Sequence, residues 1–548
     1  MNRFQRIYHV VLSGLLLSIP WLFSQTGLLL LFAFVPLLRL EQSIHRSGSG
    51  NGTRLVFLYS SLTFIIWNTL TTWWIGYAAV GAAIAAVLVN TFLMAGIFVL
   101  FHFTKKKIKS FSYLIFMAFW IGFEYLYFRT EISWPWLTLG NGLANDIHLI
   151  QWYEYTGVLG GTCWILLSNT LIFKLLYPDY PVMVKKLITN IAMIIIPVLI
   201  SLAIYYNPEK TGKCPEPGNH EHTGKPLEKN GGLVKVSIIQ PNLDPYATPP
   251  HALNEEEKMR LFQSFADTLS SHIPHIIALP EVYFDAEVWE NDIHHHSFTK
   301  RFRRYIQNNP NNSVLTGIRS YRAYFQDQPK SNTAKYSEGL GHHYDVYNTA
   351  YYIAKNQDVQ IRHKSRLVLG VEKVPYPDKL KFLGRLSARL GGISGSNGVD
   401  RHPVLFSLDS AQFGALICYE SVYGNYVRQF VKKGAQLLFV ITNDGWWNNT
   451  PGHRQHLSYS RLRAIENRKY VARSAYNGIS CYINTKGELL QQIGYGQKGA
   501  ISATIPLNAK KTFYTRNGDY IGRIAVFVSV LLLLYLMVHL LKKSDLVF

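Results

Sequence analysis

Residues 412–442 read QFGALICYESVYGNYVRQFVKKGAQLLFVIT. Two short apolar runs, at 412–417 and 436–442, have the length and composition of buried strands, and the segment at 423–432 between them fits a helix. A strand, a helix and a second strand in this order are typical of an α/β domain. We therefore predict an α/β fold for this part of the chain.

The same alternation extends in both directions from this stretch. Further strands are expected at 233–240, 275–280, 313–318, 346–354 and 479–484, and further helices at 254–272 and 455–474. Asn254 is suited to cap the first of these helices, because an Asn side chain can accept a backbone N–H of the first turn. These elements place the α/β domain at residues 232–508.

Three polar residues stand at or next to the ends of predicted strands. Glu281 follows the strand at 275–280, Lys364 lies in the run IRHKSR, and Cys418 directly follows the strand at 412–417. A thiol becomes a strong nucleophile only when it ionises. A carboxylate can take its proton, and an ammonium group can stabilise an oxyanion. Glu, Lys and Cys together are therefore sufficient for acyl transfer through a thioester.

Each of the three residues also has an ordinary structural explanation. A cysteine after an apolar strand is often a small buried hydrophobe, and a glutamate in that position is often a turn residue. Lys364 has the basic neighbours Arg362, His363 and Arg366, as solvated lysines often do. The chemistry of the residues alone leaves this choice open.

Other candidate site residues are weaker. Cys481 lies inside a predicted strand and is expected in the core, and the four cysteines form no CxxC pair. The run at 294–296 contains three histidines without a matching carboxylate or cysteine set, which favours a solvated loop. His453 and His456, near the start of the helix at 455–474, are expected in capping or surface positions.

The composition is much more apolar outside the α/β domain. Apolar stretches lie at 9–23, 27–40, 55–77, 79–103, 111–128, 155–177, 187–206 and 520–541. Since about 20 apolar residues suffice to cross a bilayer, we predict a transmembrane domain at 1–206 with about seven helices and a C-terminal transmembrane helix at 520–541. The first two stretches fit a tight hairpin, one broken span or a cleaved signal peptide, and the sequence leaves this open.

The formal net charge of +21 reflects membrane topology rather than nucleic-acid binding, because no nucleic-acid-binding motif is present. Basic residues gather at the ends of apolar stretches, at 105–109, 185–186 and 542–543. Such clusters stay on the cytoplasmic side. All three clusters agree with an α/β domain outside the cytoplasm, joined to the helices by the Pro-, Gly- and charge-rich linker at 207–231.

ALPE at 278–281, HK at 363–364 and ICYES at 417–421 resemble the Glu-Lys-Cys triad of the nitrilase superfamily, which has an αββα sandwich fold. With the flanking apolar regions, the whole chain resembles the apolipoprotein N-acyltransferase family. Further similar stretches lie at 134–137, 155–158, 240–242, 442–446 and 463–468. The resemblance implies a polytopic α-helical membrane domain together with a nitrilase-like αββα domain.

The resemblance also implies roles for individual residues. Glu281 matches the proton acceptor, Lys364 the oxyanion-stabilising lysine and Cys418 the nucleophile. Glu372 is similar to an additional glutamate that supports the site, although the turn before it reads LGV rather than Pro-Phe-Gly. Two further residues, Tyr419 and Glu420, match the pair that follows the nucleophile.

Aromatic residues at two places in the sequence are candidates for binding lipid. Tyr246 stands where the family leads us to expect a tryptophan, which weakens an assignment of lipid gating to this residue. Trp446 and Trp447 lie in a Gly- and Asn-rich loop. An exposed pair there would suit a lipid-facing lid, and packing of the loop is the alternative.

The implied reaction has two steps and needs neither a metal nor an organic cofactor. Cys418 takes an acyl chain from a phosphatidylethanolamine-like phospholipid and passes it to the N-terminal α-amine of a diacylated apolipoprotein. The implied location is the bacterial cytoplasmic (inner) membrane, with the catalytic domain on the periplasmic side. Two other interpretations remain open: a membrane-tethered amidase or hydrolase that uses water, and a transporter or sensor without enzymatic activity.

Overall fold

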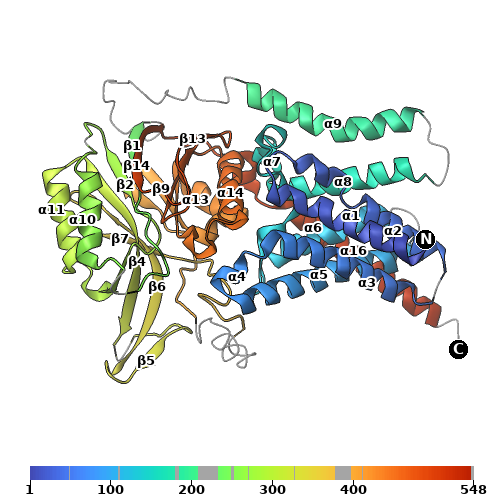
Figure 1. Cartoon of the computed structure of the whole chain (residues 1–548), viewed down its shortest axis with the longest axis horizontal. Coiled ribbons are helices and arrows are strands. Elements are labelled where there is room, and N and C mark those ends of the chain that lie inside the picture. The colour runs from blue at the N-terminus through green and yellow to red at the C-terminus, as the bar shows by residue number, and fades with distance from the viewer. Residues whose placement is uncertain are drawn as a thin grey trace. The chain divides into compact units, whose positions relative to one another are not determined.

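The computed structural model describes residues 1–48, 50–108, 112–178, 184–207, 232–248, 252–269, 271–325, 328–376, 396–409 and 411–544. Two compact units make up the chain (Figure 1): one contains Met1–Gly76, Gly81–Asn207 and Asn517–Phe548, and the other Tyr77–Val80 and Pro208–Arg516. Residues 208–231 of the predicted linker, with Cys214, lie outside the described residues. So do the side chains of the basic residues at 109, 185–186 and 542–543.

The first unit is helical, and every predicted apolar stretch overlaps one of its helices. Its main elements are α1 (Arg3–Leu22), η1 (Gly27–Leu31), α2 (Val35–Arg46), α3 (Gly52–Thr72), α5 (Val80–Lys107), α6 (Ser112–Tyr127), α8 (Val158–Leu176), α9 (Val184–Tyr206) and α16 (Tyr520–Ser544). The Ser13 hydroxyl donates to the Ala33 carbonyl oxygen at 2.5 Å, and the Met1 amine lies 3.4 Å from Ser43 Oγ. The first two apolar stretches therefore form an antiparallel hairpin.

Six helical segments among the described residues are long and apolar enough to cross a membrane. They are Gly27–Arg46, Gly52–Thr72, Val80–Lys107, Val158–Leu176, Leu187–Tyr206 and Tyr520–His539. Two of the eight predicted stretches fall short of this standard. Helix α6 has 16 residues, or about 24 Å against a hydrocarbon core of about 30 Å, and α1 begins with the polar residues Arg3, Gln5 and Arg6. These segments make the chain a multi-pass membrane protein.

The second unit contains two mixed β-sheets. The first has the order β14-β1-β2-β4-β6-β5, with β3 beside β4 and β7 beside β6, and the second has the order β13-β12-β11-β10-β9-β8. The strands of the first are β1 (Leu233–Gln240), β2 (His275–Ala278), β3 (Phe284–Trp289), β4 (Asn312–Tyr324), β5 (Lys335–Ser337), β6 (His342–Ile353), β7 (Gln360–His363) and β14 (Gly499–Pro506). Those of the second are β8 (Phe406–Leu408), β9 (Ala411–Ile417), β10 (Leu437–Thr442), β11 (Val471–Ala475), β12 (Ser480–Ile483) and β13 (Leu489–Ile493).

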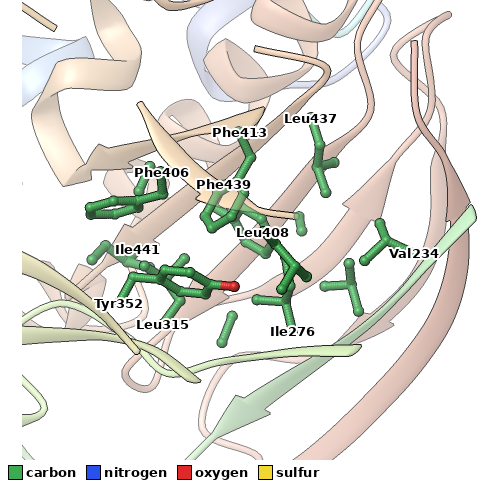
Figure 2. Close-up of a cluster of buried hydrophobic side chains, with 14 of the residues drawn as sticks. Val234, Ile276, Leu315, Tyr352, Phe406, Leu408, Phe413, Leu437, Phe439 and Ile441 are labelled. Atoms are coloured by element: carbon green, nitrogen blue, oxygen red, sulfur yellow. The ribbon is translucent and has the colours of Figure 1, made fainter. Parts of the chain in front are cut away.

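The core of this unit lies between the two sheets. Figure 2 shows side chains of the first sheet, such as Val234 and Ile276, together with Phe413 and Phe439 of the second. The opposite face of the first sheet packs on α10 (Glu255–Ala266) and α11 (Ser297–Asn308). Helices α13 (Gly424–Lys433) and α14 (Pro451–Asn467) pack on the second sheet. The layers are helix, sheet, sheet and helix, which confirms the predicted αββα fold.

Two predicted helices are wrong over their last residues. The helix expected at 254–272 ends at Ala266. The expected helix at 455–474 ends at Asn467, because Arg468 adopts a left-handed conformation with φ 49° and donates from its side chain to the Thr485 carbonyl oxygen. Val471–Ala475 is instead strand β11, which pairs with β10 and β12 inside the second sheet. A glycine normally marks this kind of helix end, and none stands here. Strands β3, β5, β7, β8, β13 and β14 also have no predicted counterpart.

Gly414 on β9 allows α13 to lie close against the second sheet. A Cβ atom at this position would stand 2.9 Å from Cδ1 and 3.1 Å from Cβ of Phe430, a fully buried side chain of α13. Real carbon atoms rarely come so close, so any side chain here forces the ring to move. The glycine is therefore a packing requirement of this layer.

We predict that Gly414→Ala lowers the stability of the protein by about 1–3 kcal/mol, the usual cost of overpacking a core. The midpoint of thermal unfolding of the purified protein in detergent measures the effect. Gly339→Ala is the matched control, since no atom lies within 4 Å of a Cβ built at Gly339. Equal midpoints for the two variants would contradict the close packing of α13 on β9.

Candidate active site

Three strand ends bring Glu281, Lys364 and Cys418 together. Glu281 follows β2 after two residues, Lys364 directly follows β7, and Cys418 directly follows β9. Their side chains are buried, with residue exposures of 6%, 1% and 6%. Lys364 Nζ donates to Glu281 Oε1 at 2.9 Å, and the Cys418 thiol interacts electrostatically with both charged groups. The structure thus gathers a carboxylate, an ammonium group and a thiol at one buried place.

The backbone of Glu281 is held by a close approach to Gly317 on β4. Gly317 N donates to the Pro280 carbonyl oxygen at 3.0 Å, and Tyr283 N donates to the Gly317 carbonyl oxygen at 2.8 Å. A Cβ at Gly317 would stand 2.6 Å from the Glu281 Cα atom and 2.4 Å from the Val282 nitrogen. Backbone atoms cannot yield as a flexible side chain can. Only glycine at position 317 leaves room for Glu281 where it stands.

Lys364 lies between two carboxylates. Its Nζ donates to Glu281 Oε1 and to Glu372 Oε1, both at 2.9 Å. Asn348 on β6 donates from Nδ2 to the same two oxygens, at 2.8 and 2.9 Å. The backbone N–H of Asn443 donates to the other oxygen of Glu281 at 2.9 Å. Glu281 is therefore fixed at both oxygens, and Glu372 and Asn348 complete the pocket of Lys364.

The charges around the site set the protonation states of Lys364 and Cys418. Burial by itself would lower the pKa of Lys364, but Glu281 and Glu372 outweigh it and hold this pKa above its usual value. Burial, and then the charge of Glu281, raise the pKa of the Cys418 thiol above its usual value despite Lys364. The resting site contains an ammonium group and a neutral thiol. A base must therefore remove the thiol proton during the reaction.

Cys418 has a strained backbone. It begins the short helix η7 (Cys418–Val422) with φ 50°, in the left-handed region that non-glycine residues rarely occupy. Such a conformation costs about 1–3 kcal/mol and persists only where the surrounding structure imposes it. It turns the chain sharply between β9 and η7 at the position of the thiol. A strained residue of this kind is a reason to infer a functional role.

Glu420 holds the turn that carries the thiol. This fully buried carboxylate accepts from the backbone N–H groups of Ile417 at 2.8 Å and Ser365 at 2.6 Å, and from Arg362 Nη2 at 2.6 Å. Arg362 Nη1 in turn donates to the Ala415 carbonyl oxygen at 2.9 Å. The end of β7, with Lys364, is thereby tied to the end of β9, with Cys418. Glu420 therefore holds the backbone next to Lys364 and next to Cys418.

A second buried hydrogen-bond network, centred on His456 of α14, contacts the backbone of Cys418. His456 Nε2 lies 2.9 Å from Ser421 Oγ and 3.1 Å from the Cys418 carbonyl oxygen, and its Nδ1 lies 3.0 Å from Asp444 Oδ1. Arg473 pairs with the other oxygen of Asp444. Burial and the charge of Arg473 lower the pKa of His456, so the ring is neutral near pH 7.

The expected capping or surface positions of His453 and His456 are therefore wrong. Both side chains are buried, and Thr450 caps α14 by accepting from Gly452 N. Helix α14 is buried on most of its surface, because the second sheet and the loops after β9 and β10 enclose it. A helix enclosed in this way shows no one-sided apolar stripe, and the sequence pattern gave no sign of the burial. Cys481, by contrast, lies in the core as expected.

The remaining predicted residues lie around this centre. Tyr419 is buried and packs edge-on against Tyr423. Tyr246 and Trp446 are 47% and 41% exposed, and their rings meet edge-on with centroids 5.2 Å apart. The Tyr246 hydroxyl donates to the Trp446 carbonyl oxygen at 2.8 Å. These two residues form a surface pair, and a role for them in binding lipid stays a prediction.

Comparison with known proteins identifies the class of the second unit first. Residues 329–512 match the carbon-nitrogen hydrolase family, and residues 13–171 match the apolipoprotein N-acyltransferase N-terminal domain. Among solved structures, a mutant of the Nesterenkonia AN1 amidase from the nitrilase superfamily is 15% identical. That comparison covers 53% of this chain and 96% of the amidase, with a TM-score of 0.35. The family match at residues 329–512 makes the second unit a carbon-nitrogen hydrolase domain.

Full-length relatives identify the family more closely. The apolipoprotein N-acyltransferase of Chlorobaculum tepidum is 29% identical, and the match covers 96% of this chain and 95% of the relative. That of Geobacter metallireducens is 24% identical, over 93% of this chain and 91% of the relative. The chain belongs to the apolipoprotein N-acyltransferase family.

We predict that Gly317→Ala lowers the acyl-transfer rate by about 100-fold, because an added methyl displaces the Glu281 backbone and a misplacement near 1 Å costs about that much. The measurement is the initial rate at which the purified protein reacts with a labelled acyl donor. Gly339→Ala again serves as the control, and thermal unfolding checks that both variants fold. A normal rate for folded Gly317→Ala would contradict the importance of the Glu281 position.

Proposed function

We propose that the protein transfers a fatty acyl chain from a membrane phospholipid, through a thioester at Cys418, to the N-terminal α-amine of a diacylglyceryl-cysteine apolipoprotein. The main support is the buried Lys364–Glu281 pair beside the Cys418 thiol, at the common end of three strands. The relatives named above carry the same activity in their names. Apolar helices in the first unit fit substrates that are both held in a bilayer.

In the first step Glu281 acts as the general base. It takes the proton from Cys418, and the thiolate attacks the ester carbonyl carbon of the phospholipid. The Lys364 ammonium group stabilises the negative charge that develops on the carbonyl oxygen. The carbon–oxygen bond then breaks, and the lysophospholipid leaves with the proton from Glu281. The acyl chain remains on the sulfur as a thioester.

In the second step the α-amine of the apolipoprotein attacks the thioester carbonyl. Glu281 takes a proton from the amine, the new amide bond forms, and the carbon–sulfur bond breaks. The proton returns to Cys418, which restores the neutral thiol of the resting site. Glu372 accepts a hydrogen bond directly from Lys364, and Asn348 donates to both Glu281 and Glu372. These bonds keep Lys364 in place through both steps.

Donor and location follow from the same proposal. A phosphatidylethanolamine-like phospholipid supplies the chain, and the protein lies in the bacterial cytoplasmic membrane with its second unit on the periplasmic side. The basic residues Lys105, Lys106 and Lys107 at the C-terminal end of α5 support this orientation.

The main alternative is a hydrolase that passes the acyl group to water. The same three residues would serve both reactions, because the acceptor depends on access to the thioester and not on the nucleophile. Cys418 is only 6% exposed, which favours an acyl-enzyme that excludes water until the amine arrives. The activity of a transporter or a sensor does not require a base, an ammonium group and a thiol gathered at one buried place.

We predict that a phospholipid with a labelled sn-1 chain loads the enzyme with about one thioester per chain when no acceptor is present, since a two-step transfer stalls there. A diacylated lipopeptide with a free N-terminal amine should then remove the label as an amide, and an N-acetylated lipopeptide should not. Cys418→Ser and Glu281→Gln should fail to load, and Lys364→Met should load poorly. Cys481→Ser is the matched cysteine control and should load normally.

The outcomes of this experiment separate the two functions. Steady release of free fatty acid without any lipopeptide would exclude the transferase and support the hydrolase. Loading of folded Cys418→Ser as a hydroxylamine-labile thioester would exclude Cys418 as the nucleophile. Thermal unfolding of each variant shows whether a loss of loading comes from lost chemistry or from a lost fold.

Orientation has a separate test. In a Cys214→Ser parent, we predict that His295→Cys on the exposed surface of the second unit reacts with an impermeant maleimide on intact spheroplasts. Lys107→Cys, at the end of α5, should react only after the membrane is permeabilised. Labelling of the unmodified parent gives the background. The reverse pattern would place the second unit in the cytoplasm, away from the proposed acceptor.

A further inference from the structure

A second cluster of chemically active side chains lies in the helical unit. Glu41 and His45 stand four residues apart on α2, and therefore on one face of this helix. His102 on α5 completes the cluster. Each residue offers one ligand atom, and the three atoms lie within 4.8 Å of one another. No other group of three such residues among the described parts of the chain meets this condition.

The hydrogen bonds of the cluster leave two imidazole nitrogens unused. His102 Nδ1 lies 2.7 Å from Glu41 Oε1, and both side chains are fully buried. A carboxylate oxygen only accepts, so Nδ1 of His102 carries a proton, and in the neutral ring Nε2 is the atom with a lone pair. His102 Nε2 and His45 Nδ1 are both buried without a hydrogen-bond partner. Buried polar atoms are almost always partnered, so this pair calls for an explanation.

The surroundings favour a cation over an anion as that partner. A histidine whose second nitrogen bonds a carboxylate is the common arrangement of a metal ligand. The cluster also lies in the last turns of α2 and α5, where helix dipoles stabilise positive charge. An anion would need a proton on each unused nitrogen and would face Glu41. Lys105 Nζ, 2.6 Å from Glu41 Oε2, and the Lys106 charge that acts on His45 both oppose a cation.

We propose that His45 Nδ1 and His102 Nε2 bind a divalent metal ion of the zinc class, while Glu41 orients the His102 ring through its Nδ1. Imidazole nitrogens suit zinc, whereas magnesium and calcium prefer oxygen ligands. The ion ties α2 to α5 within the helical unit. It takes no part in the proposed acyl transfer, which uses residues of the other unit.

Zinc binding to the full-length protein in detergent tests the proposal. The protein is purified with a tag that lacks histidine, in a His294→Ala, His295→Ala parent that removes most of the exposed histidine run, and is stripped with EDTA. Equilibrium dialysis should then give about one Zn²⁺ per chain. His45→Ala and His102→Ala should each weaken binding at least about tenfold. His539→Ala on α16 is the matched control and should bind as the parent does.

Lys105→Met separates a cation site from an anion site. Removing the ammonium group beside Glu41 should tighten Zn²⁺ binding if the site holds a metal, and Zn²⁺ should raise the thermal unfolding midpoint of the parent but not of His102→Ala. The proposal is overturned if the parent retains no Zn²⁺, or if His45→Ala and His102→Ala bind it as tightly as the parent. Weaker Zn²⁺ binding by Lys105→Met, with inorganic phosphate raising the midpoint instead, would also overturn it.

Discussion

The buried ion pair between Arg362 and Glu420 joins the two sheets at the place where the reactive residues emerge. Arg362 belongs to β7 of the first sheet, and Glu420 follows β9 of the second. Breaking such a pair leaves an uncompensated buried charge and typically costs about 3–5 kcal/mol. Because Glu420 also bonds the backbone of Ser365 and Ile417, the pair fixes the neighbours of both Lys364 and Cys418. The distance between ammonium group and thiol therefore depends on this contact.

In the proposed reaction, the charges within the site explain how a thiol that resists ionisation can react. Glu281, Glu372 and Lys364 give the resting site one excess negative charge, so an additional thiolate would be unfavourable in this buried place. Transfer of the thiol proton to Glu281 leaves the total charge unchanged and moves the negative charge toward the substrate. Lys364 then faces a developing oxyanion while it loses part of its interaction with Glu281. The same ammonium group thus stabilises the resting site and, in the proposed reaction, the transition state.

Strand-end residues were the part of the site that the sequence could predict. An apolar run followed by a polar residue indicates a side chain at a sheet edge, and parallel strands place such ends together, as β9 and β10 do here. Asn348 lies in the middle of β6 and has no such signal. The roles of Arg362 and His456 have no sequence signal either, because they depend on contacts with Glu420 and Cys418 that exist only in the folded chain. The sequence could not show where α14 ends and β11 begins, because Arg468 ends the helix in a conformation that is usual for glycine.

The membrane segments could be predicted from the local sequence pattern, for a different physical reason. A bilayer selects helices by length and hydrophobicity, which are properties of continuous sequence. The pairing of Glu41 with His102 joins residues 61 positions apart, and hydropathy carries no information about it.

The polar clusters around Glu281 and around His102 differ in how many of their charged and ring atoms have hydrogen-bond partners. Around Glu281, both carboxylate oxygens and the Lys364 ammonium group have protein partners, as a site must if it is to hold its geometry while a substrate comes and goes. Around His102, Glu41 and Lys105 satisfy each other, but two ring nitrogens do not have partners. A buried lone pair without a donor is costly in either unit. The difference therefore separates a network whose charged groups are all paired without a substrate from a cluster whose two unused ring nitrogens a permanent ligand would complete.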